Sequence, residues 1–310
     1  MSLDIKYRLN QTHCRWDNSI APLATVEPGD VVVLETKEAT DGQVFPGCSI
    51  DVLRNLDFSV IHPITGPVAV LGAEPGDVLE VEVLDILHKD WGWTAIIPGF
   101  GLMADEFDDP FLKIWELQEN IAYFKTGIRL PLEPFCGVMG VAPAEAGSLD
   151  TIPPRLNGGN IDIKQLVKGS KLLLPVLHPG ALFSLGDAHA AQGDGEVCGT
   201  AIEGPMTVTV RFGVHKGMSI PELQYTTPGT AAEKANKKGY YVTTGHSPDL
   251  FVAAKNATRN MITHMVKYYD LTRHEAYALC SVAVDLRISE IVDAPNWLVS
   301  AFLPLDIFEG

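Results

Sequence analysis

The sequence predicts a mainly β fold, with a β-sandwich-like core and a smaller C-terminal α+β portion. Gly and Pro punctuate short β-branched runs through the first three-quarters of the 310-residue chain. A turn-then-strand module is repeated there, whereas sustained helical spacing of apolar residues begins after Asp249. We expect residues 1–215 to form a β-rich catalytic core and residues 216–310 to pack on it as part of one structural unit.

The repeated module is a Glu-Pro-Gly-Asp turn that leads into an apolar strand. Residues 27–30 precede a strand at 31–34, and residues 74–77 precede a strand at 78–83. A looser version at 168–170 precedes residues 172–174. Pro presets φ for the first turn position, Gly takes the next, and Asp can hydrogen-bond the chain entering the strand. Such turns are common in β-barrels and sandwiches, so we interpret them as scaffold.

The remaining elements follow from periodicity and capping. We expect a helix at about 104–119 and further strands at 137–141, 172–177, 197–201 and 206–212. Apolar residues at helical spacing predict a helix over 250–269. Thr272, with Glu275 three residues on, forms a capping box that opens a second helix through about Val284. Residues 285–292 are a last turn or a strand, and residues 297–303 are a final strand.

Charge and composition exclude several classes of protein. The net charge is −16, and we find no Lys/Arg cluster, which disfavours binding to nucleic acid. The same charge disfavours a strongly anionic substrate and suits a neutral or a cationic one. The five cysteines lie far apart and form no Cys-x-x-Cys pair, which argues against a disulfide framework or a zinc ribbon. We find no secretory signal and no apolar run of about 18 residues, so we expect a cytoplasmic protein without a membrane partner.

One polar segment, residues 178–203, stands apart because it places charged residues among Gly and Ala. Asp187 and His189 are two residues apart, so both leave the same face of an extended strand. Oxygen and imidazole ligands on one face suit Zn²⁺ or a similar divalent ion. Residues 193–195 (Gly-Asp-Gly) indicate a tight reversal that returns the chain as a second strand and brings back Glu196 or Glu203. The competing interpretation is a β-hairpin with solvated acidic tips.

Two other segments carry polar candidates. Residues 153–162 contain two prolines and an Asn-Gly-Gly-Asn run and end in Asp162. Asp162 could be a third oxygen ligand, and Asn160 would lie on the same face if the chain is extended. A structural loop is the alternative interpretation. His62 lies before a proline in a turn, where it is either a loop histidine or a proton carrier at the mouth of the site.

These segments, taken in order, resemble the acetamidase/formamidase family. The strongest match is Gly-Asp-Ala-His-Ala-Ala-Gln-Gly-Asp-Gly-Glu at 186–196, continuing through Gly199 to Glu203. Residues 62–67 with 74–77, 137–143 and 158–162 are similar to further family blocks, so the resemblance covers nearly the whole chain. It implies an enzyme that hydrolyses formamide, acetamide or a related short amide to the acid and ammonia. It also implies a β-sandwich-like core and a homo-oligomer.

We therefore expect an amidohydrolase that acts on linear amides through a divalent metal ion, Zn²⁺ first, with Ca²⁺ allowed at a second site. A bound ion lowers the pKa of its water from 15.7 to about 7. The expected metal ligands are Asp162, Asp187, His189 and Glu203; the catalytic residues are Glu196 and His62; and the substrate-binding residues are Thr65, Asn160 and Gln192. Glu196 is the expected general base and acid, and Glu203 is a metal ligand. The two roles can also be reversed, because a single-residue β-bulge between these residues would change which face of the strand each side chain occupies.

Other functions remain open at this point. Cys48 or Cys136 could be the nucleophile of a metal-free amidase with His62 or His189 as base. A cupin-like metal oxygenase would need more histidines near Asp187, where the neighbours are Ala. A non-catalytic small-molecule or metal-binding protein is the last alternative, and it would release no ammonia from any amide.

Overall fold

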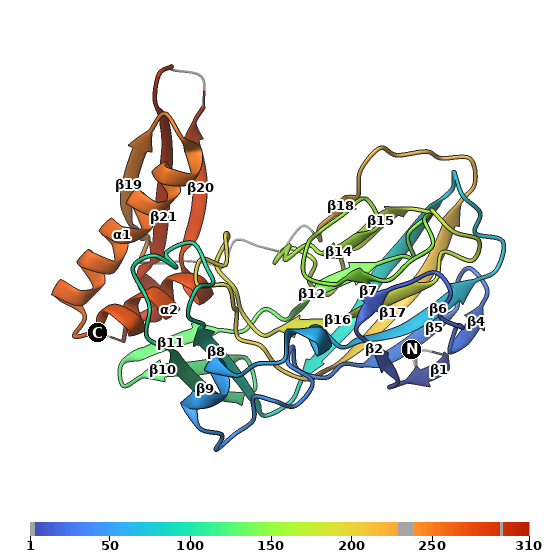
Figure 1. The fold of residues 1–310 in the computed structure, drawn as a ribbon, viewed down its shortest axis with the longest axis horizontal. Helices are drawn as coiled ribbons and strands as arrows, with labels where there is room; N and C mark the ends of the chain where they lie inside the picture. Colours follow the sequence, from blue (N-terminus) through green and yellow to red (C-terminus); the bar gives the residue numbers. More distant parts are fainter. Residues whose placement is uncertain (1–3, 229–237, 292–293, 310) are drawn as a thin grey trace.

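The computed structural model describes residues 4–228, 238–291 and 294–309. Strands dominate these residues, and two α-helices lie near the C-terminus (Figure 1). The predicted fold class is therefore confirmed.

Two mixed sheets form the sandwich. The strand order of the first is β1 (Ile5–Leu9), β5 (Val31–Glu35), β17 (Met206–His215), β7 (Val78–His88), β15 (Lys171–Pro175) and β18 (Gln224–Thr226). The order of the second is β14 (Gly158–Asn160), β12 (Phe135–Gly140), β16 (Phe183–His189), β6 (Ile64–Val70) and β2 (Thr12–His13), with β4 (Ala24–Val26) parallel to β6. The rings of Phe183 and Phe212 meet between the two sheets with their centroids 5.4 Å apart.

Two smaller sheets extend this core. One has the order β11 (Ile128–Pro131), β10 (Ile121–Lys125), β9 (Phe111–Gln118) and β8 (Trp91–Ile96), and β13 (Leu149–Asp150) pairs with β3 (Arg15–Trp16). Alternating burial in β9, with Trp115 and Leu117 inside and Glu116 and Gln118 outside, is the pattern of a strand with one face in the core.

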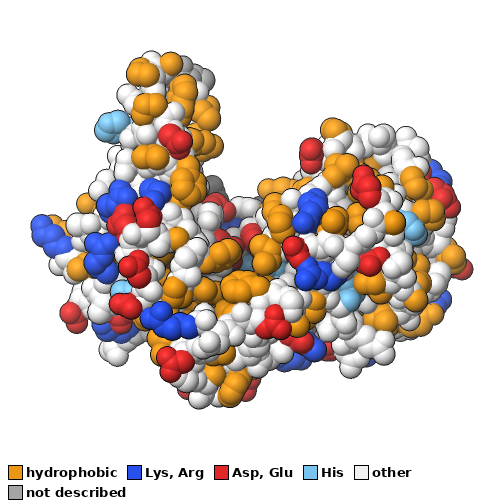
Figure 2. All heavy atoms as spheres, viewed as in Figure 1, with side chains coloured by type: hydrophobic (Ala, Val, Ile, Leu, Met, Phe, Trp, Pro, Cys, Tyr) orange, Lys and Arg blue, Asp and Glu red, His pale blue; other side chains and the backbone are white. Residues whose placement is uncertain are grey.

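The C-terminal part forms a column at one side of the molecule (Figure 1). Its sheet has the order β19 (Tyr240–Ser247), β21 (Trp297–Pro304) and β20 (Asp285–Glu290), and α1 (Leu250–Tyr268) packs on it. The second helix, α2 (Arg273–Ala283), begins with the predicted capping box of Thr272 and Glu275. Figure 2 shows a hollow between this column and the larger part of the molecule.

A single cluster of buried side chains joins the column to the sandwich. It contains Tyr277 and Leu279 of α2 together with Val208 and Leu185 of the two large sheets. This shared core supports one structural unit, whereas the boundary at residues 215 and 216 stays a prediction.

The predicted strands at 31–34, 78–83, 137–141, 172–177, 206–212 and 297–303 are confirmed within a few residues, and 285–292 contains a strand rather than a helical turn. The predicted helices at 250–269 and from Thr272 are also confirmed. The helix expected at 104–119 is wrong, because this segment contains β9 between β8 and β10. The strand expected at 197–201 is wrong as well: the segment makes turns, and its backbone bonds to a side chain of α2 rather than to another strand.

All five cysteines have free thiols, in agreement with the absence of a predicted disulfide framework. Within the described part of the chain, neither helix combines the length and apolar character needed to span a bilayer.

Candidate active site

The candidate site lies where β16 ends. Asp187 and His189 are its last polar residues, and both are buried. The chain then returns beside β16: the Ala190 N–H donates to the Ile202 carbonyl at 2.8 Å, and His189 forms an isolated antiparallel bridge with Glu203. The predicted reversal that brings Glu203 back is therefore present. The tight hairpin is not, because residues 192–201 form a loop between the two paired positions.

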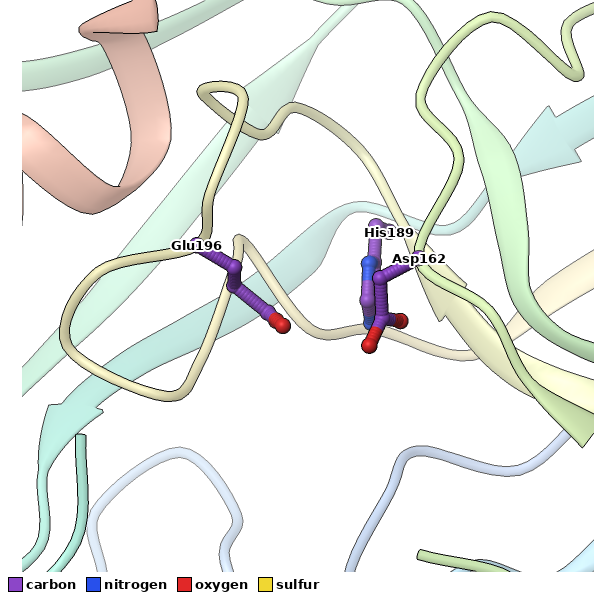
Figure 3. Close-up of side chains that lie close together, drawn as sticks. All are labelled: Asp162, His189 and Glu196. Carbon is purple, nitrogen blue, oxygen red and sulfur yellow. The ribbon is translucent and has the colours of Figure 1, made fainter. Parts of the chain in front are cut away.

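Five side chains converge there and are called the carboxylate–histidine cluster below: Asp162, Asp187, His189, Glu196 and Glu203. His189 is central, with its Nε2 3.0 Å from Glu203 Oε2 and 3.4 Å from Asp187 Oδ2. One ligand atom from each of Asp162, His189 and Glu196 also lies within 4.8 Å of the other two. Figure 3 shows Glu196 on its loop, directed toward Asp162 and His189.

Several buried atoms of the cluster have no hydrogen-bond partner among the described residues. The atoms are Asp162 Oδ1, Asp187 Oδ1, His189 Nε2 and Glu203 Oε2. An unsatisfied buried polar group costs roughly 1–3 kcal/mol, and a charged one costs more. Carboxylate oxygens and an imidazole nitrogen that face one another in this way are a donor set suited to a divalent cation.

Gly137 of β12 makes room for this donor set. A Cβ at residue 137 would lie 2.5 Å from Asp162 Oδ1, 2.7 Å from His189 Cε1 and 2.9 Å from Asp187 Oδ2. Any side chain would therefore displace three members of the cluster. The sequence did not reveal this role of Gly137, although a glycine inside a buried strand indicates a close approach by another group.

Gln192 fixes the orientation of the His189 ring. His189 Nδ1 lies 2.9 Å from Gln192 Oε1, and Gln192 Nε2 donates to the Asp162 carbonyl at 2.9 Å. Because an amide oxygen only accepts, Nδ1 donates to Gln192, and the ring is held with Nε2 toward the cluster. The expected substrate-binding residue Gln192 thus lies behind the histidine, outside the residues that line the pocket.

Mutual charge and burial shift the cluster's pKa values strongly. Burial raises the pKa of Asp162 and of Glu203 to about 7 each. Burial and the charge of Asp162 hold the pKa of Glu196 well above its usual range. Burial alone would lower the pKa of His189, but Glu203 and Asp187 raise it. The protein therefore resists placing full negative charge here unless a cation balances it.

The other predicted site residues are divided between the pocket and the interior. His62 lines the pocket, with Nε2 3.7 Å from Asp187 Oδ2 and Nδ1 without a hydrogen-bond partner in the described structure. Asn160 also lines it, and its Oδ1 is buried and unpartnered among the residues described. Thr65 does not line it: its hydroxyl donates to the Glu35 carbonyl at 2.8 Å inside the sandwich.

Helix α2 holds the loop that carries Glu196, a role that the sequence did not reveal. Tyr277 Oη accepts from the Met103 N–H at 2.8 Å and donates to the Val197 carbonyl. Ser281 Oγ accepts from the Cys198 N–H at 3.1 Å and donates to the Thr200 carbonyl at 2.7 Å. The backbone on the C-terminal side of Glu196 is thus tied to a buried helix.

We expect Tyr277→Phe to lower kcat about tenfold while metal content and KM change little. The substitution removes the hydroxyl that hydrogen-bonds the Val197 carbonyl and the Met103 N–H, so we expect the Glu196 loop to shift. A small displacement of a reacting group lowers the reaction rate strongly. Steady-state kinetics with metal analysis will measure the effect. Tyr240→Phe, at an exposed tyrosine of β19, is the matched control and should keep wild-type kinetics. An unchanged kcat in Tyr277→Phe would contradict the positioning role.

The cysteines give little support to a thiol nucleophile. Cys136 is buried in the core, and burial raises the pKa of its thiol to about 12. Cys48 packs beside a separate apolar cluster and does not line the pocket. A nucleophilic cysteine needs the opposite, a lowered pKa and access to the substrate.

Comparisons with known proteins agree with this picture. The model of the acetamidase/formamidase family matches residues 2–148 and 144–310. A formamidase from Methylophilus methylotrophus is 28% identical over 376 residues, which cover 96% of this chain and 90% of that protein.

Two solved structures are similar along almost their whole length. A γ-lactamase from Delftia acidovorans has a TM-score of 0.89 at 29% identity, covering 97% of this chain and 90% of that one. An acetamidase from Bacillus halodurans has a TM-score of 0.68 at 34% identity, covering 96% of this chain and 97% of that one.

Proposed function

This chain belongs to the acetamidase/formamidase family, and we therefore propose that it hydrolyses an uncharged linear amide to a carboxylic acid and ammonia at a divalent metal centre. It is an amidohydrolase that acts on C–N bonds other than peptide bonds. Related proteins are named formamidase and acetamidase, which supports a linear amide as the substrate.

One observation carries the metal proposal: buried donor atoms of the cluster face one another without hydrogen-bond partners in the described structure. The residues that would hold the ion are Asp162, Asp187, His189 and Glu203. Bound there, a divalent ion would polarise the amide carbonyl and lower the pKa of a coordinated water molecule. We propose Zn²⁺ because the donor set combines imidazole nitrogen with carboxylate oxygen. A second site for Ca²⁺ stays a prediction.

Glu196 is the proposed general base and acid. Its carboxylate faces Asp162 and His189 and lines the pocket. Burial and the charge of Asp162 raise its pKa above the usual range of a glutamate, which favours a group that can carry a proton. In this role it takes a proton from the attacking water and returns it to the departing nitrogen. An amine is a poor leaving group unless it is protonated, so this transfer is required for the C–N bond to break.

His62 and Asn160 are proposed to orient the amide group. The unpartnered Asn160 Oδ1 can accept from the amide N–H of the substrate, and the His62 ring can donate to its carbonyl oxygen. Burial lowers the pKa of His62, so its ring is neutral at pH 7 and has one N–H to donate. The homo-oligomer and the cytoplasmic location stay predictions.

The test of this function combines metal analysis with ammonia release. We expect about one Zn²⁺ per chain by elemental analysis of purified protein, since the donor atoms of Asp162, Asp187, His189 and Glu203 that lack a partner in the described structure belong to one cluster. Ammonia should be released from formamide, acetamide or a longer linear amide. Bound metal without ammonia from any linear amide, or ring opening of a γ-lactam alone, would contradict the proposed reaction. Full activity in metal-free protein would contradict the metal centre.

A further inference from the structure

The pocket above the cluster is larger than a formamide or acetamide molecule requires. Its volume is about 410 Å³, within the range of roughly 300–1,000 Å³ that pockets for much larger, drug-sized ligands occupy. Formamide and acetamide carry at most a methyl group beyond the amide. Either one would leave most of this pocket filled with water.

One wall of the pocket is apolar. Its side chains come from the segment before β6 and from around β8: Leu56, Phe58, Ile61, Trp93, Ile97 and Phe100. Four of these residues, Leu56, Phe58, Ile97 and Phe100, also line a second hollow of about 320 Å³. Arg54 lines this second hollow as well, and its guanidinium is paired with Asp109 at 3.5 Å. Figure 2 shows hydrophobic side chains along the margin of the hollow beside the column.

Phe58 and Phe100 are the exposed members of this wall, with 46% and 40% of their surface accessible. The position of Phe100 is set by Gly199, because a Cβ at residue 199 would lie 2.4 Å from Phe100 Cδ1. The ring therefore lies against the backbone of the loop that carries Glu196. Exposed aromatic side chains that border a pocket are typical of a ligand-binding surface.

The charge around the pocket limits what this wall can bind. The charged side chains that line it, among the residues described, are the carboxylates of the cluster, and neither Lys nor Arg is present. A carboxylate or phosphate on the distal end of a substrate would find no cation there and would meet a net charge of the same sign. A distal group that stays within this pocket must therefore be uncharged and apolar.

We propose that the physiological substrate is a primary amide with an extended, uncharged apolar acyl group, of the size of hexanamide or benzamide, that lies on Phe58 and Phe100. This inference rests on the proposed amide hydrolysis and specifies its substrate class. Formamide and acetamide are then poor substrates that occupy only the polar end of the pocket.

Ammonia release from acetamide, butanamide and hexanamide tests the substrate class. Each added methylene buried on the wall should raise kcat/KM about fourfold, so hexanamide should exceed acetamide on the order of a hundredfold. Adipamate, in which a carboxylate replaces the terminal methyl group of hexanamide, should be hydrolysed at least about tenfold more slowly than hexanamide. A kcat/KM that stays flat or falls with chain length would overturn the inference. A lack of ammonia from every amide would overturn the proposed reaction itself.

Variants identify the wall that makes this selection. Phe58→Ala and Phe100→Ala should each lower the ratio of kcat/KM for hexanamide to that for acetamide about tenfold. Phe251→Ala, which removes an exposed phenylalanine of α1 outside this pocket, is the matched control and should leave the ratio unchanged. Ratios equal to the wild-type value in both wall variants would show that the acyl group does not bind here and would overturn the assignment.

Discussion

Glu196→Gln is expected to lower kcat at least about a thousandfold while the protein keeps its metal. The substitution preserves size and leaves the residues proposed to hold the ion intact. It removes the ability to take up and release a proton, which the side chain of Glu has and that of Gln lacks. General acid–base groups contribute on the order of 10²–10⁴ in rate, and this residue is proposed to act twice in each turnover. Ammonia release and elemental analysis of the same preparation measure both quantities.

Two further variants make this result specific. Glu145→Gln, at an exposed glutamate, should behave as wild type. Glu203→Gln should reduce metal content, because Glu203 lies 3.0 Å from His189 and belongs to the proposed ligand set. The reverse result, with metal lost in Glu196→Gln and retained in Glu203→Gln, would exchange the roles of these two residues. Full turnover in Glu196→Gln would remove it from the mechanism.

Metal removal is expected to abolish turnover and to make stability depend on pH. In the metal-free protein, burial raises the pKa of Asp162 from 3.8 to about 7 and that of Glu203 from 4.5 to about 7. When the pKa of a group is higher in the folded than in the unfolded state, the group contributes its full stabilisation at a pH below the pKa of the unfolded state. This stabilisation is lost as the pH rises through the pKa of the folded state. The pKa of His189 is also raised, so its contribution is lost in the same direction. The lowered pKa of His62 acts in the opposite direction below its unfolded value of 6.5, but it is one group against three.

The metal-free protein should therefore have a higher Tm at pH 5 than at pH 8. At about 1.4 kcal/mol per pKa unit, the shift at Asp162 alone corresponds to a few kcal/mol of unfolding free energy. Added Zn²⁺ should restore the Tm at pH 8, because an ion that binds only the folded state stabilises it. Calorimetry or fluorescence-monitored unfolding after chelation will measure the difference.

The net charge of −16 could by itself lower stability as the pH rises, so a control is needed. Asp162→Asn removes one raised carboxyl group and changes the net charge by only one unit. Its metal-free form should show a smaller difference in Tm between pH 5 and pH 8 than the wild type. An equal difference in both proteins would assign the pH effect to the whole surface and contradict the role of the cluster.

Much of the fold could be predicted because its signals are local. The alternation of apolar residues in 207–212 and the turns that precede 31–34 and 78–83 are signals between residues a few positions apart. All three segments, 31–34, 78–83 and 207–212, are strands in the structure. The capping box of Thr272 and Glu275 is equally local and is present. The helix expected at 104–119 failed because β8 and β10 flank residues 111–118 and complete their backbone hydrogen bonds.

The site could be predicted in part. Asp187, His189 and Glu203 belong to one run of sequence, and the structure brings them together with Asp162 and Glu196. Thr65 and Gln192, the other expected substrate-binding residues besides Asn160, do not line the pocket. Their neighbours in sequence do reach the site, but whether a side chain faces the pocket or the interior depends on local backbone turns that composition does not specify.

The sequence by itself determined the residue types of the cluster, its order along the chain and the extended segment that carries Asp187 and His189. Only the tertiary structure revealed the roles of Gly137 and Tyr277, which act on residues far from them in sequence. The same holds for the apolar wall, since Phe58 and Phe100 come from separate segments. The physical reason is that periodicity records which face of a segment is buried, whereas packing decides which buried faces meet.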